Sequence, residues 1–239
     1  TLCRNGSKIN GICQNTTLNT KSQSVTLIYV DGTKGWQDIH DSTSNVTGTP
    51  TFIVATGGTI ADSGNFRIHT FTSSGTFTID TAPTPANNNV SYMVVAGGGG
   101  GGSAPSSNVG AAAGAGGFRE GETPAAPYTG SPLKNCAGLP VSVQAYPITV
   151  GAGGAGNAAS SPWVGANGAN SIFSSITSAG GGGGGSGASP GSPTAAGSDG
   201  GSGGGGGGGS PVSSNPGGSG NTPPTSPPQG QNGGGGRPG

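Results

Sequence analysis

Blocks of consecutive glycine are the feature that most restricts what this chain can fold into. They occupy residues 97–102, 180–185, 203–209 and 233–236. Glycine has no side chain to bury and loses much conformational entropy when it is ordered, so these blocks cannot form an ordinary hydrophobic core. Because the glycines come in blocks and not at every third position, a collagen triple helix is excluded.

Two structures remain open for the glycine blocks. The first is disorder, since a segment with few apolar residues cannot offset its chain entropy. The second is a bundle of polyglycine-II helices, which have three residues per turn and a rise of about 3.1 Å per residue. Their amides point outward, so neighbouring helices can pair them, and only glycine allows the close approach, helped by Cα–H···O contacts. Several runs of similar length, separated by turns with Pro and Asn, favour the bundle.

The glycines are unevenly distributed, which divides the chain into regions. Of the 55 glycines, 46 fall in residues 97–239 and nine in residues 1–96. We expect short strands over 1–41, a connector over 42–50, strands leading into the glycine-rich region over 51–96, and a glycine-rich region with Ser/Pro/Ala loops over 97–239. The chain opens at Thr1 without Met and stops in a Gly/Pro tract, so we expect it to be a piece of a longer polypeptide.

The remaining apolar residues alternate with polar ones as in β-strands, and no stretch has helical periodicity. Strands are predicted at 24–30, at 35–39 with Trp36 to bury, and at 51–56, 67–72, 75–79, 91–96, 140–145, 146–150 and 171–177, the pair 67–72 and 75–79 forming a hairpin. The predicted fold is an all-β N-terminal part with short antiparallel strands of β-prism or β-sandwich type. A glycine-rich domain of polyglycine-II helices follows, with essentially no α-helix. A single copy would leave strand edges that a trimer covers, so we expect the N-terminal part to be trimeric.

Composition excludes several classes of function. The chain has 8 basic and 8 acidic residues and no Lys/Arg run, so it lacks the cations that nucleic-acid binding requires. No segment reaches the roughly 18 apolar residues of a membrane span. The cysteines Cys3, Cys13 and Cys136 form no CxxC pair and have no histidine nearby, which argues against a metal site or another cofactor. A Cys3–Cys13 disulfide stays open.

One motif suggests catalysis. Residues 54–62, VATGGTIAD, resemble the nucleophile segment of bacterial-type asparaginases. The HGTDT stretch of those enzymes is missing, and a nucleophile without an activating base is inert. Glu120 and Glu122 form a close pair of carboxylates, but they flank Gly121 in what we expect to be a loop. We therefore expect no enzyme activity and interpret Thr56 to Thr59 as a hairpin turn.

Longer stretches carry a more extensive resemblance. Residues 4–39, RNGSKINGICQNTTLNTKSQSVTLIYVDGTKGWQDI, resemble a β-repeat module of tail fibre proteins from tailed bacteriophages, notably marine ones. The runs FRIHTFTSSGTFTI, VSYMVVAGGGGGG, AGAGGFREG, YPITVGAGGAG and NSIFSSITSAGGGGGG follow in order and resemble the glycine-rich domain of phage tail fibres and adhesins. These blocks cover most of residues 4–186, and the last fifty residues match in composition only.

The resemblance implies a virion tail fibre protein whose first 41 residues end a β-repeat module. Its implied partners are two further copies in a homotrimer, other tail and baseplate proteins, and a bacterial surface glycan or outer-membrane protein. The glycine scaffold would include Gly97, Gly102, Gly151, Gly156, Gly180, Gly185, Gly203 and Gly209. It would display loops at 103–113, 122–135, 157–167, 186–199 and 210–231.

Aromatic residues outside the predicted strands are the candidate receptor contacts, namely Phe118, Tyr128 and Trp163. Two alternatives stay open. One is a purely architectural fibre segment. The other is a non-viral glycine-rich surface or extracellular protein, such as a matrix or ice-binding protein, although only isolated Thr-x-Thr pairs such as Thr70-Phe71-Thr72 support ice binding.

Overall fold

The structure is a computed structural model. It describes residues 6–9, 13, 24–41, 52–64, 66–83, 88–104, 110–123, 129–157, 163–187, 196–208 and 215–237. The chain divides into two compact units, Thr1–Thr51 and Phe52–Gly239. The described residues contain no α-helix, and their strands form small antiparallel sheets, which confirms the predicted all-β class. The expected connector at 42–50 lies outside the described residues.

The first unit contains an antiparallel hairpin of β1 (Val25–Asp31) and β2 (Gly35–Asp41). Its turn is held by Asp31, whose Oδ1 accepts hydrogen bonds from the amides of Thr33 at 2.8 Å and Lys34 at 2.6 Å. Trp36 packs edge-on against Tyr29, with ring centroids 5.4 Å apart. The predicted burial of Trp36 is not found within one chain, where the residue is 38% exposed, because, outside the hairpin, the described residues of this unit place only the segment around Ile9 beside it.

The second unit begins with a group of strands that we call the platform. A five-stranded sheet has the order β13-β12-β11-β6-β3, and β8 pairs with β9 and β7 with β10. The bounds are β3 (Val54–Thr56), β6 (Gly75–Thr81), β7 (Asn89–Val90), β8 (Tyr92–Val95), β9 (Phe118–Gly121), β10 (Leu139–Pro140), β11 (Ala145–Thr149), β12 (Ser171–Phe173) and β13 (Ile176–Ser178). The platform therefore takes strands from both sides of residue 96.

An aromatic cluster forms the centre of the platform. Phe173 lies edge-on to Phe77, Tyr146 and Tyr92, at centroid distances of 5.9, 6.1 and 6.5 Å. Ile79 is 1% exposed and belongs to the same core. The alternation of Phe77 and Ile79 with polar neighbours along β6 is the period-two pattern of a half-buried strand.

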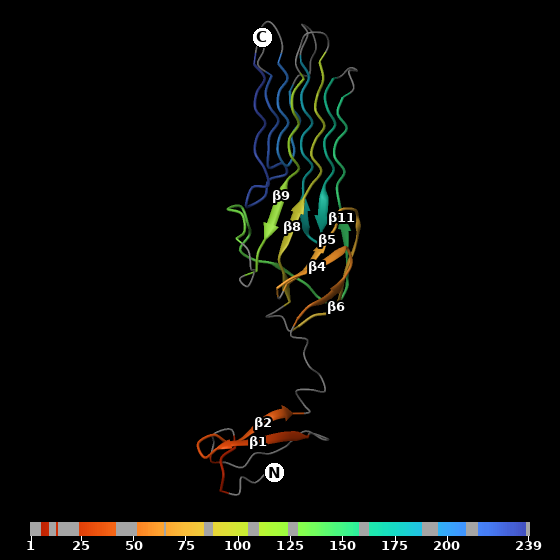
Figure 1. The fold of residues 1–239 in the computed structure, drawn as a ribbon. Helices are drawn as coiled ribbons and strands as arrows, with labels where there is room; N and C mark the ends of the chain where they lie inside the picture. Colours follow the sequence, from red (N-terminus) through yellow and green to blue (C-terminus); the bar gives the residue numbers. More distant parts are fainter. Residues whose placement is uncertain are drawn as a thin grey trace. The chain divides into compact units, whose positions relative to one another are not determined.

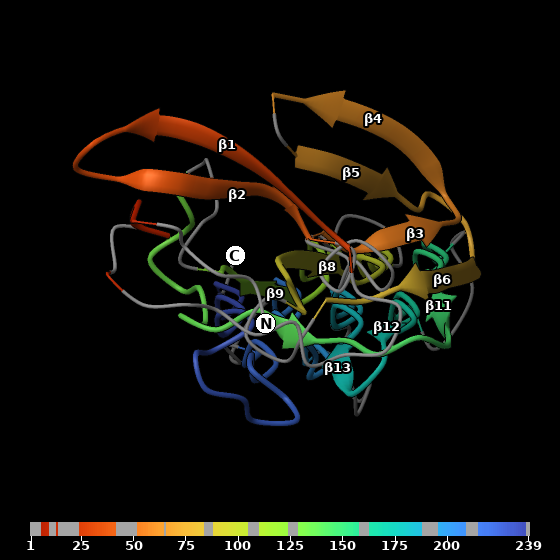
Figure 2. The same cartoon turned by 90° about the horizontal axis from the view of Figure 1, so that it is seen from below.

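One predicted pairing is wrong. The stretch 67–72 does not pair with 75–79: β5 (Phe66–Thr70) pairs with β4 (Thr59–Ser63), while β6 pairs with β3 and β11. Figure 2 shows the β4–β5 hairpin to one side of β6, β11, β12 and β13. The turn from Thr56 to Thr59 is accordingly a corner between two sheets and not a hairpin turn.

Beyond the platform the chain forms extended rods. We number them rod 1 (96–104), rod 2 (110–117), rod 3 (150–157), rod 4 (163–170), rod 5 (179–187), rod 6 (196–200), rod 7 (202–208), rod 8 (215–220) and rod 9 (229–237). The first five continue platform strands without a break, since β8, β11 and β13 run into rods 1, 3 and 5, and rods 2 and 4 run into β9 and β12. Figure 1 shows the rods side by side, rising from β8, β9 and β11.

The hydrogen bonds between rods repeat every third residue. Gly97, Gly100 and Ser103 of rod 1 donate to carbonyl oxygens of rod 4 at 3.0, 2.8 and 2.7 Å. This spacing is that of a threefold polyproline-II-type helix, and a β-ladder would repeat every second residue. No described glycine of the rods has a φ between +20° and +160°. Residues 97–237 of the described chain thus contain the expected polyglycine-II bundle.

Rod 5 is the centre of the bundle. Residues 180–185 are all buried, and each of their amides and carbonyls is hydrogen-bonded. The partners come from rods 1, 2, 4 and 7, from Ser198 of rod 6 and from Gly201. Two partners are side chains of rod 4, where the Oδ1 atoms of Asn170 and Asn167 accept from Gly180 and Gly183 at 2.9 and 2.8 Å.

Candidate functional site

The ends of the rods furthest from the platform are the first candidate site. Ser103 joins several rods there: its amide donates to Trp163 O at 2.7 Å, its hydroxyl donates to Asn157 Oδ1 at 3.0 Å, and its carbonyl accepts from Gly187 at 3.4 Å. These residues end or begin rods 1, 3, 4 and 5. Rods 1, 3 and 5 therefore end, and rod 4 begins, at the same end of the bundle.

The structure changes the extent of the expected loops. Residues 110–113, 163–167, 196–199 and 215–220 lie in rods, so the connections are shorter than the sequence suggested. The stretch 122–135 lies at the opposite end, beside the platform, where Glu122 donates its amide to Asn135 O at 3.0 Å and Asn135 donates to Glu120 O at 2.8 Å. The turn 221–228, which belongs to the expected loop 210–231, likewise lies at the platform end, since Gln229 accepts from the amides of Phe118 and Ala179.

The three aromatic candidates do not form one surface. Trp163 opens rod 4 at the far end with a φ of 64°, and its side chain is partly buried. Phe118 lies in β9 opposite Val95, at the platform end, and its amide donates to Gln229 O at 2.9 Å. Tyr128 lies outside the described residues. All three stay predictions as receptor contacts, and of the two that are described only Trp163 lies where the ends of rods 1, 3, 4 and 5 meet.

The space around each scaffold glycine shows whether the fold would accept a side chain there. A methyl group at Gly97, Gly102, Gly151, Gly180 or Gly203 would overlap a backbone oxygen of a neighbouring rod. At Gly156 it would come no closer than 3.7 Å to Gly101 O, so packing within the chain does not demand glycine there. Gly185 donates to Gly205 O at 2.8 Å, and Gly209 lies outside the described residues.

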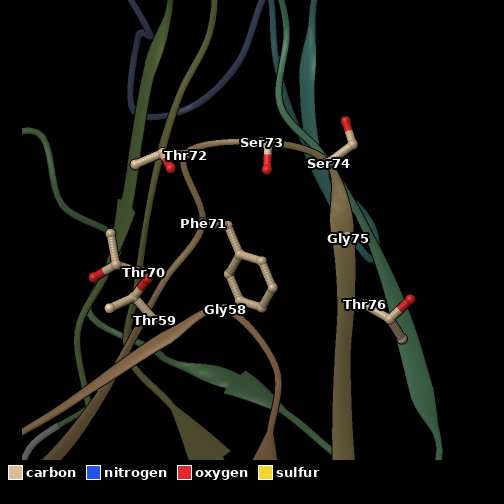
Figure 3. Close-up of a pocket in the computed structure, with 9 residues that line it drawn as sticks. All are labelled: Gly58, Thr59, Thr70, Phe71, Thr72, Ser73, Ser74, Gly75 and Thr76. Atoms are coloured by element: carbon tan, nitrogen blue, oxygen red, sulfur yellow. The ribbon is translucent and has the colours of Figure 1, made fainter.

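A cavity of about 240 Å³ lies where β5 leads into β6, and the sequence analysis did not identify it. Its lining consists of Gly58, Thr59, Thr70, Phe71, Thr72, Ser73, Ser74, Gly75 and Thr76 (Figure 3). Hydroxyl groups can donate and accept hydrogen bonds, and none of these residues is charged. The cavity is therefore chemically suited to a neutral polar group that also has an apolar face. The alternation of Thr with Phe from residue 70 to 72 was the available signal.

The TGGT motif supports one wall of this cavity. Gly57 and Gly58 have φ angles of 105° and 65°, which β-branched residues rarely adopt. A methyl group at Gly58 would lie 3.1 Å from the ring of Phe71, so the glycines also make room for that ring. Gly57 O lies 2.8 Å from Nδ1 of His69, whose ring packs edge-on to Phe77 at 5.0 Å. In this structure the motif shapes a corner of the backbone.

The carboxylates of Glu120 and Glu122 bind a neighbouring segment of the chain. Glu120 belongs to β9 and not to a loop, and both Glu120 and Glu122 are 8% exposed. Glu120 Oε2 accepts from the amide of Ser131 at 2.9 Å, and Glu122 forms an ion pair with Lys134. Together these contacts hold the segment 129–135 against β9.

Cys13 and Cys136 carry free, exposed thiols, and Cys3 lies outside the described part. Among the residues that the structure describes, no group of three or more His, Cys, Asp or Glu side chains is placed to hold a metal ion. No helix in that part of the chain is long and apolar enough to cross a membrane.

The fold and its bonding define a class: a polyglycine-II bundle built on a small all-β platform. A family described as a glycine-rich domain matches residues 70–239 of this chain, and the chain belongs to that family. The match includes β6 to β13 and every rod. No curated protein and no solved structure matches the chain.

Proposed function

We propose that the chain is a structural component of a bacteriophage tail fibre and contributes to attachment at the host cell surface. Its action is binding without catalysis, and its location is the virion. The observation that carries the proposal is that the ends of rods 1, 3, 4 and 5 meet at one end of the bundle, at Ser103, Asn157, Trp163 and Gly187. The order of fibre-like sequence blocks from residue 4 to 186 supports the viral setting.

The bundle is suited to presenting these rod ends. Each rod is bonded to its neighbours at every third residue, and rod 5 has no open backbone group between residues 180 and 185. A rigid support lowers the ordering cost of binding. Several copies on one particle would then convert weak individual contacts into avidity. The receptor would be a bacterial surface glycan or an outer-membrane protein.

We also propose that the fibre is a homotrimer through its first unit. In one chain the β1–β2 hairpin leaves Ile28, Tyr29 and Val30 each about half exposed. A two-stranded hairpin is marginal by itself and gains stability when another layer covers its apolar side chains. Native mass spectrometry of the full chain should give the trimer mass, and a folded monomer at micromolar concentration would contradict this part of the proposal.

Adhesion of the full chain to bacteria tests the attachment function. Beads that carry the fluorescently labelled full chain should bind cells of at least one strain in a panel of marine bacteria. Trp163→Asn should weaken binding about tenfold or more, since Trp is enriched among dominant contact residues, and Asn tolerates the positive φ at this position. Phe52→Ala is the matched control, because Phe52 is an exposed aromatic residue near the start of the second unit.

Two outcomes would contradict attachment. Failure to bind any strain, even on beads, would leave an architectural segment as the better description. Equal effects of Trp163→Asn and Phe52→Ala would remove the far end of the bundle from the binding surface. Immunogold labelling of phage particles tests the viral setting separately, because antibodies to the chain should decorate tail fibres.

A further inference from the structure

The contacts between rods follow a simple rule. Two adjacent rods are joined by a row of backbone hydrogen bonds that point the same way and recur every third residue. Rod 1 donates one row to rod 4 and another to rod 2, the latter from Gly99 to Gly114 O and from Gly102 to Ala111 O, each at 2.9 Å. It accepts one row from rod 3 and one from rod 5. A threefold rod has three donor rows and three acceptor rows, so one of each is left.

The remaining rows of rod 1 are open. The amides of Gly98 and Gly101 and the carbonyls of Gly99 and Gly102 have no hydrogen-bond partner among the described residues. Gly101 is exposed and Gly98 is partly exposed. An uncovered row of donors beside an uncovered row of acceptors resembles the edge of a β-sheet, where another chain can add its own backbone.

Glycine at this face is not required by packing within the chain. A methyl group at Gly98 would approach nothing closer than Gly114 O at 3.8 Å, and one at Gly101 nothing closer than Ala111 O at 3.8 Å. On the adjoining rod 3, Gly153 and Gly156 would each tolerate a methyl group at 3.7 Å. Gly100 differs, because its methyl group would overlap Ala155 O. Rod 1 at Gly98 and Gly101, and rod 3 at Gly153 and Gly156, therefore have glycine where a methyl group would fit.

From these observations we propose that the open face of rod 1, which lies between rods 2 and 3, binds glycine rods of a second copy of this chain. The open donor and acceptor rows would be filled as they are inside the bundle. This contact lies in the glycine-rich region and is separate from the trimer contact of the first unit. It does not depend on the viral setting.

The chemistry of the face selects this occupant. A partner must supply donors and acceptors at a three-residue period, which a β-strand does not, and proline-rich segments lack the amide donors. It must also lack Cβ atoms at the contact, as the closely packed glycines between rods of this chain do. Residues 96–104, 110–117 and 150–157 contain no charged side chain, so an ionic partner has nothing to pair with.

The test compares the full chain with two variants, both of which replace glycine by alanine. Gly98→Ala combined with Gly101→Ala adds methyl groups that the chain tolerates but a docked rod does not. Gly234→Ala is the matched control, because a methyl group there meets nothing within 4 Å and Gly234 lies on rod 9. Sedimentation velocity over a concentration series should show association between bundles that the double variant weakens about tenfold or more and the control leaves unchanged.

Amide hydrogen exchange of the unmodified chain gives a second readout. The amides of Gly98 and Gly101 should become protected as concentration rises, while those of Gly97 and Gly100, which are already bonded, change little. Unchanged exchange at Gly98 and Gly101 up to the highest concentration would overturn the proposal. The proposal would also be overturned if the double variant associated as strongly as the original chain. A trimer as the only oligomer of both proteins would be such a result.

Discussion

The platform and the rods belong to one compact unit, yet they are stabilised in opposite ways. In the platform, side chains are the stabilising element, and Phe173 contacts three other aromatic rings. In the rods the absence of side chains is the stabilising element, because it lets carbonyl oxygens of one rod approach the Cα atoms of the next. The hydrophobic term, which dominates ordinary folding, is therefore small in the rods, and backbone hydrogen bonds and Cα–H···O contacts replace it.

The difference also explains how one region continues into the other. β8 ends at Val95 and rod 1 follows, while β9 starts directly after rod 2. β8 and β9 are antiparallel, and rods 1 and 2 keep that direction. The platform thus sets the direction and neighbours of the first five rods. When side chains give way to glycine, a backbone can take hydrogen-bonded neighbours on several sides, and the bonding period changes from two to three.

The largest effect should come from removing a side chain in the platform. Phe173→Ala should lower the free energy of unfolding by about 3–5 kcal/mol, because it leaves a cavity in a packed aromatic core. Chemical denaturation followed by near-ultraviolet circular dichroism measures it. Phe52→Ala is the control, since Phe52 is 75% exposed and should change stability by no more than about 0.5 kcal/mol.

The rods should respond to the reverse change, the addition of a side chain. Gly183→Ala places a methyl group against Gly165 O in the centre of the bundle and should cost about 1–3 kcal/mol or more. Amide exchange across 179–187 should accelerate. The matched variant Gly234→Ala should be as stable as the original chain or slightly more stable, because alanine reduces the entropy of the unfolded chain. Equal loss in both variants would show that close approach is not what glycine provides.

A smaller effect is expected at the junction between the two regions. Gln229 is 2% exposed, its Oε1 accepts from the amide of Ala179 at 2.8 Å, and its Nε2 donates to Pro223 O at 2.8 Å. Gln229→Ala leaves that buried amide without a partner and should cost about 1–3 kcal/mol. The exposed neighbour Gln231 supplies the control, and Gln231→Ala should be close to neutral in the same thermal unfolding experiment.

The smallest effect is electrostatic and falls on the first unit. Hydrogen bonds from the amides of Lys34 and Thr33 hold the pKa of Asp31 below its ordinary value. A depressed folded-state pKa contributes stability above the unfolded-state pKa, and this stability is lost as pH falls through the folded-state pKa. Acid titration followed by NMR should loosen the β1–β2 turn, whereas rods 1 to 3, which have no charged residue, should keep their amide protection. Simultaneous loss in both regions would contradict this separation.

The sequence by itself determined most of the strands and the rods made of glycine blocks, because each property is local. It missed β4 and β9, and it gave as loops the stretches 110–113, 163–167, 196–199 and 215–220, which lie in rods and are richer in Ala, Asn, Ser and Pro. Alternating apolar residues specify period two, as at Phe77 and Ile79, and a run without Cβ atoms permits period three. Blocks of glycine also ruled out a conventional hydrophobic core within the glycine runs themselves. The exclusion of collagen followed from the same spacing.

Only the tertiary structure decided which of these elements are neighbours. The pairing of β5 with β4 depends on the backbone corner at Gly57 and Gly58. The central place of rod 5 depends on partners in rods 1 and 2, which are distant in sequence, as well as in the nearer rods 4, 6 and 7. All glycine runs look alike in sequence, so nothing local marks the buried Gly183 or the open Gly98. Their difference arises because each rod has six directions of contact, and the order in which the platform delivers the rods decides which directions are filled.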